Sequence, residues 1–218
     1  MRDLARVAAI PWFARQPAPL REALLREGRL QRRRPGEWIH GEGDEETGVL
    51  AVVEGVLKVY GQAPGGREAL IALLPAGAMI GQSVAFGGGP RLVTPIAAGP
   101  AVTFTLADGA LRRVAATHPG LWEALGMLVY AQLRVNAMAV AEFVALEPRL
   151  RLVSRLLQLA ALFAGPIEIS QTDLAEMIGV TRKAVNAWLG ELEAKGLVER
   201  GYGRISVLNA AGLERMLG

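Results

Sequence analysis

Side chains that can read nucleic acid by hydrogen bonds gather in one short stretch near the C-terminus. Arginine can grip guanine with two hydrogen bonds, asparagine can do the same with adenine, and lysine takes guanine or phosphate. Such residues stand in the first turn and a half of a predicted helix, at Thr181, Arg182, Lys183 and Asn186. A helix of this kind enters the major groove with its N-terminal half, where side chains reach base edges. The stretch therefore predicts contact with double-stranded DNA.

The elements that must position these side chains form a helix-turn-helix with a wing. Ser170 is a good N-cap for a first short helix that ends at Ile178. Gly179 permits the tight turn, and Thr181 caps the second helix, which runs to Lys195. A hairpin follows at residues 199–208. Contacts to the DNA phosphates are expected from the start of the first helix and from the wing, at Ser170, Gln171, Thr172, Arg200 and Arg204.

A long helix precedes this segment, from His118-Pro119 to Leu146. Apolar residues with a 4-3-4-3 spacing run along it, as on a helix that packs against a coiled-coil partner. We therefore expect a homodimer, in which this seam is the interface. Asn136 in the seam either fixes the register of the dimer or faces a ligand. The seam consists of Val129, Leu133, Asn136, Val140 and Phe143.

Proline marks the end of the long helix. Glu147-Pro148 interrupts it, because proline cannot continue the hydrogen-bond ladder but fits the first turn of a new helix. A hinge is expected there, followed by a helix over residues 149–163 and a short strand over residues 167–169.

The N-terminal half has a different texture. Two amphipathic helices are expected, at residues 4–13 and 19–29. From Glu37 to about Leu106, short apolar runs alternate with glycines, which is typical of a β-roll or barrel. The clearest strands lie at residues 49–53, 56–60, 69–74 and 101–106, with a hairpin loop at 62–67. The predicted fold is α+β in three parts: a β-roll domain with N-terminal helices (1–118), a dimerisation helix (119–146) and a winged helix-turn-helix domain (147–218).

Composition excludes several classes of protein. The 218 residues are 51% hydrophobic and 21% charged, which describes a folded chain, and the net charge of +3 excludes a blanket basic coat. The absence of cysteine rules out disulfides, thiolate zinc sites and cysteine-ligated iron–sulfur clusters. Prolines and glycines break the long uncharged window Ala69–Pro90, and arginines interrupt the N-terminal apolar run. We expect a cytoplasmic protein with no membrane span.

The chain resembles the Crp/Fnr family of bacterial transcription regulators from about residue 30 to 208. Two segments carry the resemblance: residues 171–182, QTDLAEMIGVTR, and residues 75–81, PAGAMIG. It implies a cyclic-nucleotide-binding-type β-roll, a dimerisation helix and a winged helix-turn-helix. It also implies a homodimer on a two-fold symmetric operator, with Arg182 as the base-contacting arginine and RNA polymerase as a possible further partner. Lys183 stands where several relatives have glutamate, and Ala187 where they have arginine, so the operator is expected to differ from that of the cyclic AMP receptors.

The resemblance also places an effector site in the roll, where the sequence departs further. Cyclic AMP receptors use a Gly-Glu pair for ribose, an Arg-Ser pair for the phosphate, and Thr and Ser of the long helix for the base. Here these places read Gly81-Gln82, Arg91-Leu92 and Asn136-Ala137. Since each lost hydrogen bond costs roughly 1 kcal/mol, cyclic AMP should bind much more weakly. Two alternatives stay open: an empty roll, or a small anionic effector on Gly81, Gln82, Ser83, Arg91 and Asn136.

Other functions find less support in the sequence. Family members that sense gases use cysteine-held clusters or haem, but cysteine is absent, and His40 and His118 lie in turn-like contexts. We therefore expect no cofactor. No Gly-x-Ser-x-Gly elbow, HExxH motif or P-loop indicates an enzyme. The main alternative is a cyclic-nucleotide-binding-type module that acts through protein contacts without DNA binding. That alternative predicts salt-insensitive DNA association, whereas a DNA reader loses affinity steeply with salt.

Overall fold

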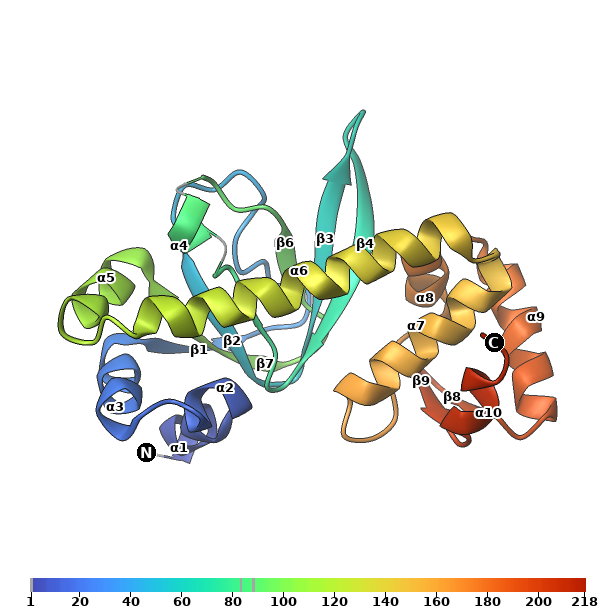
Figure 1. Cartoon of the computed structure of the whole chain (residues 1–218). Coiled ribbons are helices and arrows are strands. Elements are labelled where there is room, and N and C mark those ends of the chain that lie inside the picture. The colour runs from blue at the N-terminus through green and yellow to red at the C-terminus, as the bar shows by residue number, and fades with distance from the viewer. Residues whose placement is uncertain (1, 83, 88) are drawn as a thin grey trace. The chain divides into compact units, whose positions relative to one another are not determined.

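The computed structural model describes residues 2–82, 84–87 and 89–218, and the chain divides into two compact units (Figure 1). The first unit ends at Arg134 and the second begins at Val135, so the boundary lies within helix α6 (Leu121–Ala145). The predicted hinge at Glu147-Pro148 lies inside the second unit. Ser83, one of the expected effector residues, lies outside the described residues.

Two antiparallel sheets form the β-roll of the first unit, as the sequence predicted. One sheet has the strand order β1-β7-β2-β5 and the other β4-β3-β6. The expected hairpin joins β3 and β4, with Ala63 paired to Arg67. The strands are β1 (Arg29–Arg33), β2 (Gly48–Glu54), β3 (Val56–Ala63), β4 (Arg67–Pro75), β5 (Met79–Ile80), β6 (Thr94–Ala97) and β7 (Ala101–Ala107).

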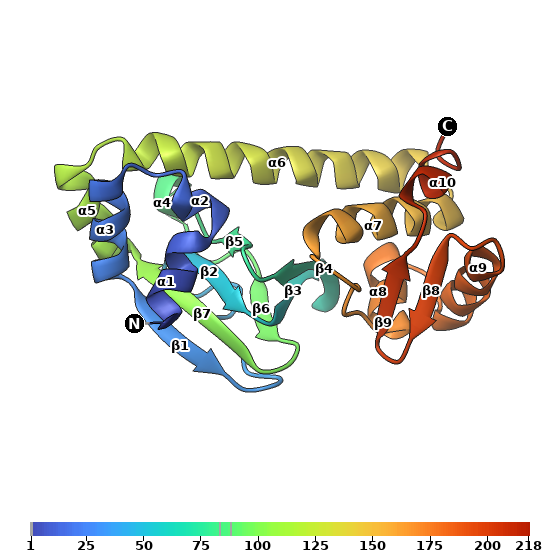
Figure 2. The same cartoon turned by 90° about the horizontal axis from the view of Figure 1, so that it is seen from below.

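Strand β2 is buried on both faces and separates two cores. Leu50 and Val52 face the core between the two sheets. Val49 and Val53 face a second core, which the N-terminal helices and the start of α6 complete. Figure 2 shows these helices beside β1, β2 and β7. Because both faces are covered, β2 is a continuous apolar run rather than an alternating one.

The helices of the first unit differ in part from the prediction. The single helix expected at residues 4–13 is two helices, α1 (Arg2–Ala9) and α2 (Pro11–Ala14), because Pro11 has no N–H with which to continue α1. Helix α3 (Ala18–Glu27) was expected, whereas α5 (Asp108–Thr117) was not. A short helix, α4 (Val84–Gly87), follows β5.

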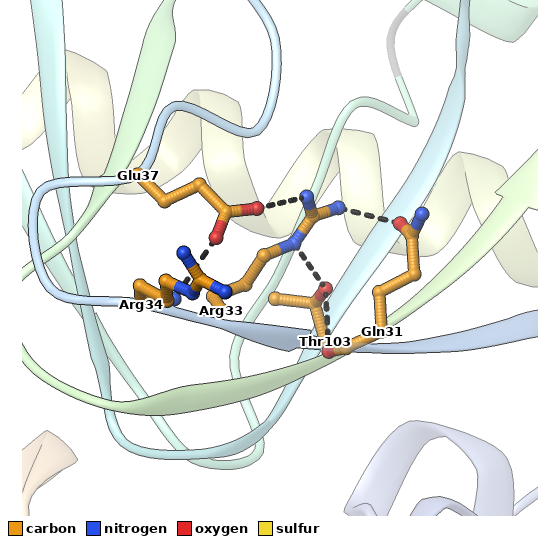
Figure 3. Close-up of polar contacts among 5 residues, drawn as sticks. All are labelled: Gln31, Arg33, Arg34, Glu37 and Thr103. Atoms are coloured by element: carbon orange, nitrogen blue, oxygen red, sulfur yellow. Dashed lines mark hydrogen bonds and ion pairs between the residues drawn. The ribbon is translucent and has the colours of Figure 1, made fainter.

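Edge strand β1 was also missed, because the sequence analysis began the β-rich region at Glu37. Its five residues include three arginines, so it lacks an apolar run. Arg33 secures this edge: its guanidinium donates to Oγ1 of Thr103 on β7 at 3.3 Å and to Glu37 at 2.8 Å (Figure 3). Glu37 also accepts from the backbone N–H of Arg34, and this bond, together with the one from Arg33, lowers the pKa of the Glu37 carboxyl. A charged strand is thus fixed by contacts distant in sequence.

Helix α6 contributes to both units. In the first unit Leu121 and Leu125 are buried, and Nε1 of Trp12 donates to the carbonyl of Ala124 at 3.1 Å. Among the described helices, α6 alone is long and apolar enough to cross a membrane by length and composition, which by itself is weak evidence. The long uncharged window at residues 69–90 holds most of β4 and all of β5.

The second unit contains the predicted winged helix-turn-helix. Its elements are α7 (Pro148–Leu162), α8 (Gln171–Ile178), α9 (Arg182–Ala194), β8 (Val198–Gly201), β9 (Arg204–Val207) and α10 (Ala210–Glu214). Helix α7 starts at Pro148, as expected, whereas α10 was not predicted. The strand expected at residues 167–169 is a single bridge between Ile167 and Ile205.

The last turns of α6 pack against α7. Oε1 of Glu142 accepts hydrogen bonds from Oγ of Ser154 at 2.8 Å and from Nε2 of Gln158 at 2.7 Å. The guanidinium of Arg151 lies 4.6 Å from the centre of the Phe143 ring. These contacts attach the end of α6 to the second unit.

Candidate nucleic-acid interface

Local hydrogen bonds explain why α8 and α9 begin where they do. Oγ of Ser170 accepts from the backbone N–H of Asp173 at 3.0 Å and donates to its carboxylate at 2.6 Å. Oγ1 of Thr181 accepts from the N–H of Ala184 at 3.2 Å. Between the helices Gly179 has φ +71°, in the left-handed region that favours glycine. The caps and the turn are therefore those that the sequence predicts.

The two helices pack through one face each. Leu174 of α8 and Val185 and Leu189 of α9 are fully buried. On the opposite face of α9, Arg182, Lys183 and Asn186 are exposed. Their exposure leaves the start of α9 accessible to a large partner.

The predicted DNA-binding residues gather around one hollow of about 800 Å³, between the starts of α8 and α9 and the β8–β9 wing. All of them line it except Thr181, whose hydroxyl oxygen serves as the cap of α9. None of the lining residues is acidic. The predicted residues in the lining are Ser170, Gln171, Thr172, Arg182, Lys183, Asn186, Arg200 and Arg204. A concave surface with four cations suits a polyanion.

Arg200 is held by its neighbours, which the sequence analysis did not foresee. Its Nε and Nη2 donate to Oε2 of Glu193 at 2.8 and 2.6 Å, and its backbone N–H donates to Oε1 at 2.8 Å. These hydrogen bonds lower the pKa of the Glu193 carboxyl. Nη1 of Arg200 lies 3.2 Å from Oδ1 of Asn186. The Glu193 carboxylate neutralises part of the charge of Arg200. The contact between Arg200 and a DNA phosphate stays a prediction.

Tyr202 is a further surface residue that the sequence analysis missed. It is fully exposed at the tip of the wing, in the lining of the hollow. The flanking glycines, Gly201 and Gly203, could have indicated from the sequence that Tyr202 lies in a tight hairpin turn. In the structure Gly203 has φ +66°, as such a turn requires.

The expected effector residues fall into both units. In the first unit, Nε and Nη1 of the buried Arg91 donate to the carbonyls of Glu46 and Gly48 at 2.9 and 2.6 Å. Burial lowers the pKa of this guanidinium. Gly81 has φ +90°, and a Cβ built there would lie 2.6 Å from Nη1 of Arg91. Gly81 and Arg91 are therefore neighbours, but Arg91 is directed at the backbone of its own domain.

The other two described effector residues differ in their surroundings. Gln82 is buried, and within the described part of the chain its Oε1 has no hydrogen-bond partner. Asn136 is an exposed residue of α6 and belongs to the second unit. In the first unit, two effects lower the pKa of His40 to about 4: burial, which is the larger, and the positive charge of Arg91. Within the described part of the roll, buried polar atoms without a hydrogen-bond partner therefore include Oε1 of Gln82, Oγ1 of Thr105 and the ring nitrogens of His40.

The predicted dimer seam lies on an exposed face of α6. Leu133 and Val140 are 63% and 64% exposed, whereas Val129 is partly buried. Phe143 is 45% exposed and lies close to Gly179 as well as Arg151. Helix α6 also exposes apolar side chains outside the predicted seam, at Met127, Tyr130, Val135, Met138 and Val144.

Two protein families match the chain, and together they span most of it. Residues 30–118 match the cyclic nucleotide-binding domain, and residues 150–216 match the Crp-like helix-turn-helix domain. The first range covers the β-roll with α5, and the second covers almost all of α7 and the winged helix-turn-helix.

Two bacterial regulators are similar to most of this chain. The "CRP-like cAMP-activated global transcriptional regulator" of Mycobacterium tuberculosis is 25% identical over 171 residues, which cover 75% of this chain and 76% of the relative. The "Cyclic AMP receptor protein" of Thermus thermophilus is 26% identical, over 83% of this chain and 84% of the relative. The solved structure of FixK2 from Bradyrhizobium japonicum superimposes with a TM-score of 0.76, at 21% identity, and covers 86% of this chain and 96% of that one. This last likeness confirms the fold.

Proposed function

Because the chain belongs to the Crp/Fnr family of DNA-binding transcription regulators, we propose that it is a sequence-specific homodimer that inserts α9 of each subunit into the major groove of an operator. A family of regulators gives no support to an enzymatic role. DNA and RNA polymerase are cytoplasmic in bacteria, so we propose that the protein acts there.

One observation carries this proposal: the hollow collects the predicted phosphate-binding and base-reading residues on one acid-free surface. The start of α8, with Ser170, Gln171 and Thr172, would hold one phosphate strand, because the N–H groups of a helix start favour anions. Arg204 would hold the other side from the wing. Arg182 and Lys183, exposed at the start of α9, would then face base edges.

The exposed apolar face of α6 supports the dimer. A second copy that packs on Leu133 and Val140 would cover these side chains. To enter successive major grooves, the two α9 helices of the dimer must lie about 34 Å apart. A lipid bilayer is a poorer occupant, since Arg134 stands near the middle of α6 and a charge there is costly inside a membrane.

The residues in the roll do not fit cyclic AMP as the cyclic AMP receptors hold it. Arg91 already donates through Nε and Nη1 to two backbone carbonyls, and the neighbouring Leu92 is an exposed apolar side chain in place of serine. We therefore propose that DNA binding does not require cyclic AMP. Among the described residues, the buried Oε1 of Gln82 has no hydrogen-bond partner and could accept from another small ligand.

Operator selection followed by affinity measurements tests the proposal. Duplexes selected from a random pool should show two-fold symmetry, with half-sites about 10–10.5 bp apart. Arg182→Ala should weaken binding to the selected operator by about 1–3 kcal/mol and relax the base preference at one position of each half-site. Lys195→Ala, at the far end of α9, is the matched control that removes a cation away from the hollow.

Two outcomes would refute this function. In the first, the wild-type protein enriches no sequence and binds all duplexes with the same weak, salt-insensitive affinity, as a module acting through protein contacts would. In the second, Arg182→Ala and Lys195→Ala behave alike on every duplex, so that Arg182 reads no base.

A further inference from the structure

We propose that Arg200 is a positioning residue that fixes the side-chain amide of Asn186 for reading adenine, and that Glu193 holds Arg200 in place. This inference rests on the proposed DNA-binding function and adds to it a specificity device that joins the wing to the recognition helix. Three residues carry it, two on α9 and one on β8.

The side chain of Arg200 lies along α9. Asn186 and Glu193 are seven residues apart, which is about two turns, so they share one face of the helix. Arg200 bridges them: Nε and Nη2 contact Oε2 of Glu193, and Nη1 contacts Oδ1 of Asn186. The backbone N–H of Arg200 donates to Oε1 of the same glutamate, so Glu193 holds both its main chain and its side chain.

Gly190 lies beneath this bridge, where a residue as small as alanine would still fit. A Cβ at this position would lie 3.7 and 3.8 Å from Nη1 and Nη2 of Arg200. The guanidinium therefore passes directly over the backbone of α9, and a side chain longer than alanine at residue 190 would displace it.

The bridge decides which way the amide of Asn186 points. A guanidinium has only donors, so the amide must turn its oxygen toward Arg200 and its NH₂ group away. The oxygen keeps a second lone pair, with which it can accept from N6–H of adenine while the NH₂ group donates to N7. Guanine presents two acceptors at the same edge and would meet the fixed oxygen with one of them. A fixed amide therefore favours adenine.

Glu193 also changes what Arg200 can do for affinity. Its carboxylate neutralises the guanidinium, so Arg200 attracts phosphate less than an unpaired arginine would. Phosphate contact is then left to Arg204 on the wing and to the start of α8, which also line the hollow. Arg200 is expected to affect base preference and not the number of phosphates neutralised.

This distinction can be measured on the full-length protein with the selected operator and with duplexes that carry the other three bases at the Asn186 position. That position is the one where Asn186→Ala loses its preference. The wild type should prefer adenine by about tenfold. Arg200→Met keeps the apolar stem and removes the donors; it should reduce the preference to about that of Asn186→Ala. Adding it to Asn186→Ala should change nothing further.

The salt dependence of binding separates positioning from phosphate contact. Arg200→Met should leave the slope of log affinity against log salt unchanged, whereas the control Arg204→Met should reduce its magnitude by about 1 and keep the adenine preference. Glu193→Gln should weaken the preference and make the slope steeper, because it frees the charge of Arg200. Circular dichroism at the binding temperature checks that each variant is folded. If Arg200→Met does not fold, Gly190→Leu is a second variant that displaces the Arg200 side chain.

Several results would overturn the inference. If Arg200→Met reduced the slope by about 1 and left the base preference intact, Arg200 would be a phosphate contact. If Asn186→Ala kept every base preference, Asn186 would read no base and Arg200 would have nothing to position. A wild type without any sequence preference would instead refute the proposed function itself.

Discussion

Replacing Arg91 with methionine distinguishes a structural arginine from a ligand-binding one. Arg91 is buried and donates to the carbonyls of Glu46 and Gly48. Methionine keeps most of the apolar stem but leaves both carbonyls without this donor, and each buried unpaired group costs about 1–3 kcal/mol. The substitution also removes the free-energy cost of burying the charged guanidinium, and this offsets part of the loss. We expect the free energy of unfolding of the first unit to fall by about 2–4 kcal/mol.

The assay is urea unfolding followed by tryptophan fluorescence in a Trp188→Phe background. Trp12, Trp38 and Trp122 then report on the first unit alone. Arg204→Met, in the second unit, is the matched control and should leave the transition of the first unit unchanged. In parallel, millimolar cyclic AMP should leave the wild-type midpoint in place, because a ligand raises stability only when it binds the folded state.

The opposite pattern would refute the reasoning. If Arg91→Met lowered stability by less than about 0.5 kcal/mol, the two carbonyl bonds would be dispensable. If cyclic AMP also stabilised the wild type and not the variant, Arg91 would be a ligand clamp, and the proposal of cyclic AMP independence would fail.

Two further predictions concern the separate units. The pKa of His40 is lowered from 6.5 to about 4 by burial and the charge of Arg91, so the folded state binds fewer protons than the unfolded state. The contribution of His40 to the free energy of unfolding of the first unit should therefore be fully present above about pH 6.5 and decrease as the pH drops toward 4. In His40→Gln, the urea midpoints should lose this part of the pH dependence. Gly179→Ala should destabilise the second unit by about 1–2 kcal/mol, because alanine is strained at φ +71°. Thermal unfolding checks this, with Gly126→Ala inside α6 as the control, which should be neutral or stabilising; equal melting of wild type and Gly179→Ala would contradict the assigned turn.

The helix-turn-helix could be predicted because its signals are local. Ser170 and Thr181 each cap a helix by bonding to a backbone N–H three residues later, and Gly179 supplies the turn by its own conformation. The fold class and the family followed from such short-range patterns. The structure then groups the predicted DNA-binding residues around one hollow, since caps and hairpin fix their relative positions within the second unit.

Other features depend on partners that are distant in sequence. Edge strand β1 is held by Arg33 and its contact with Thr103, seventy residues away, so its own charged sequence gave no strand signal. The directions of Arg91 and Arg200 could not be read either, because an arginine alone does not show which acceptors surround it.

The sequence by itself therefore determined which elements form where their causes lie within a few residues, and it nominated the side chains that we expect to contact DNA. Only the tertiary structure decided which of those charges are already paired. Hydrogen-bond acceptors such as the Glu46 carbonyl and the Glu193 carboxylate come within reach of an arginine only after the chain has folded. An arginine that is bonded in this way stabilises the fold and is less available for a contact with DNA.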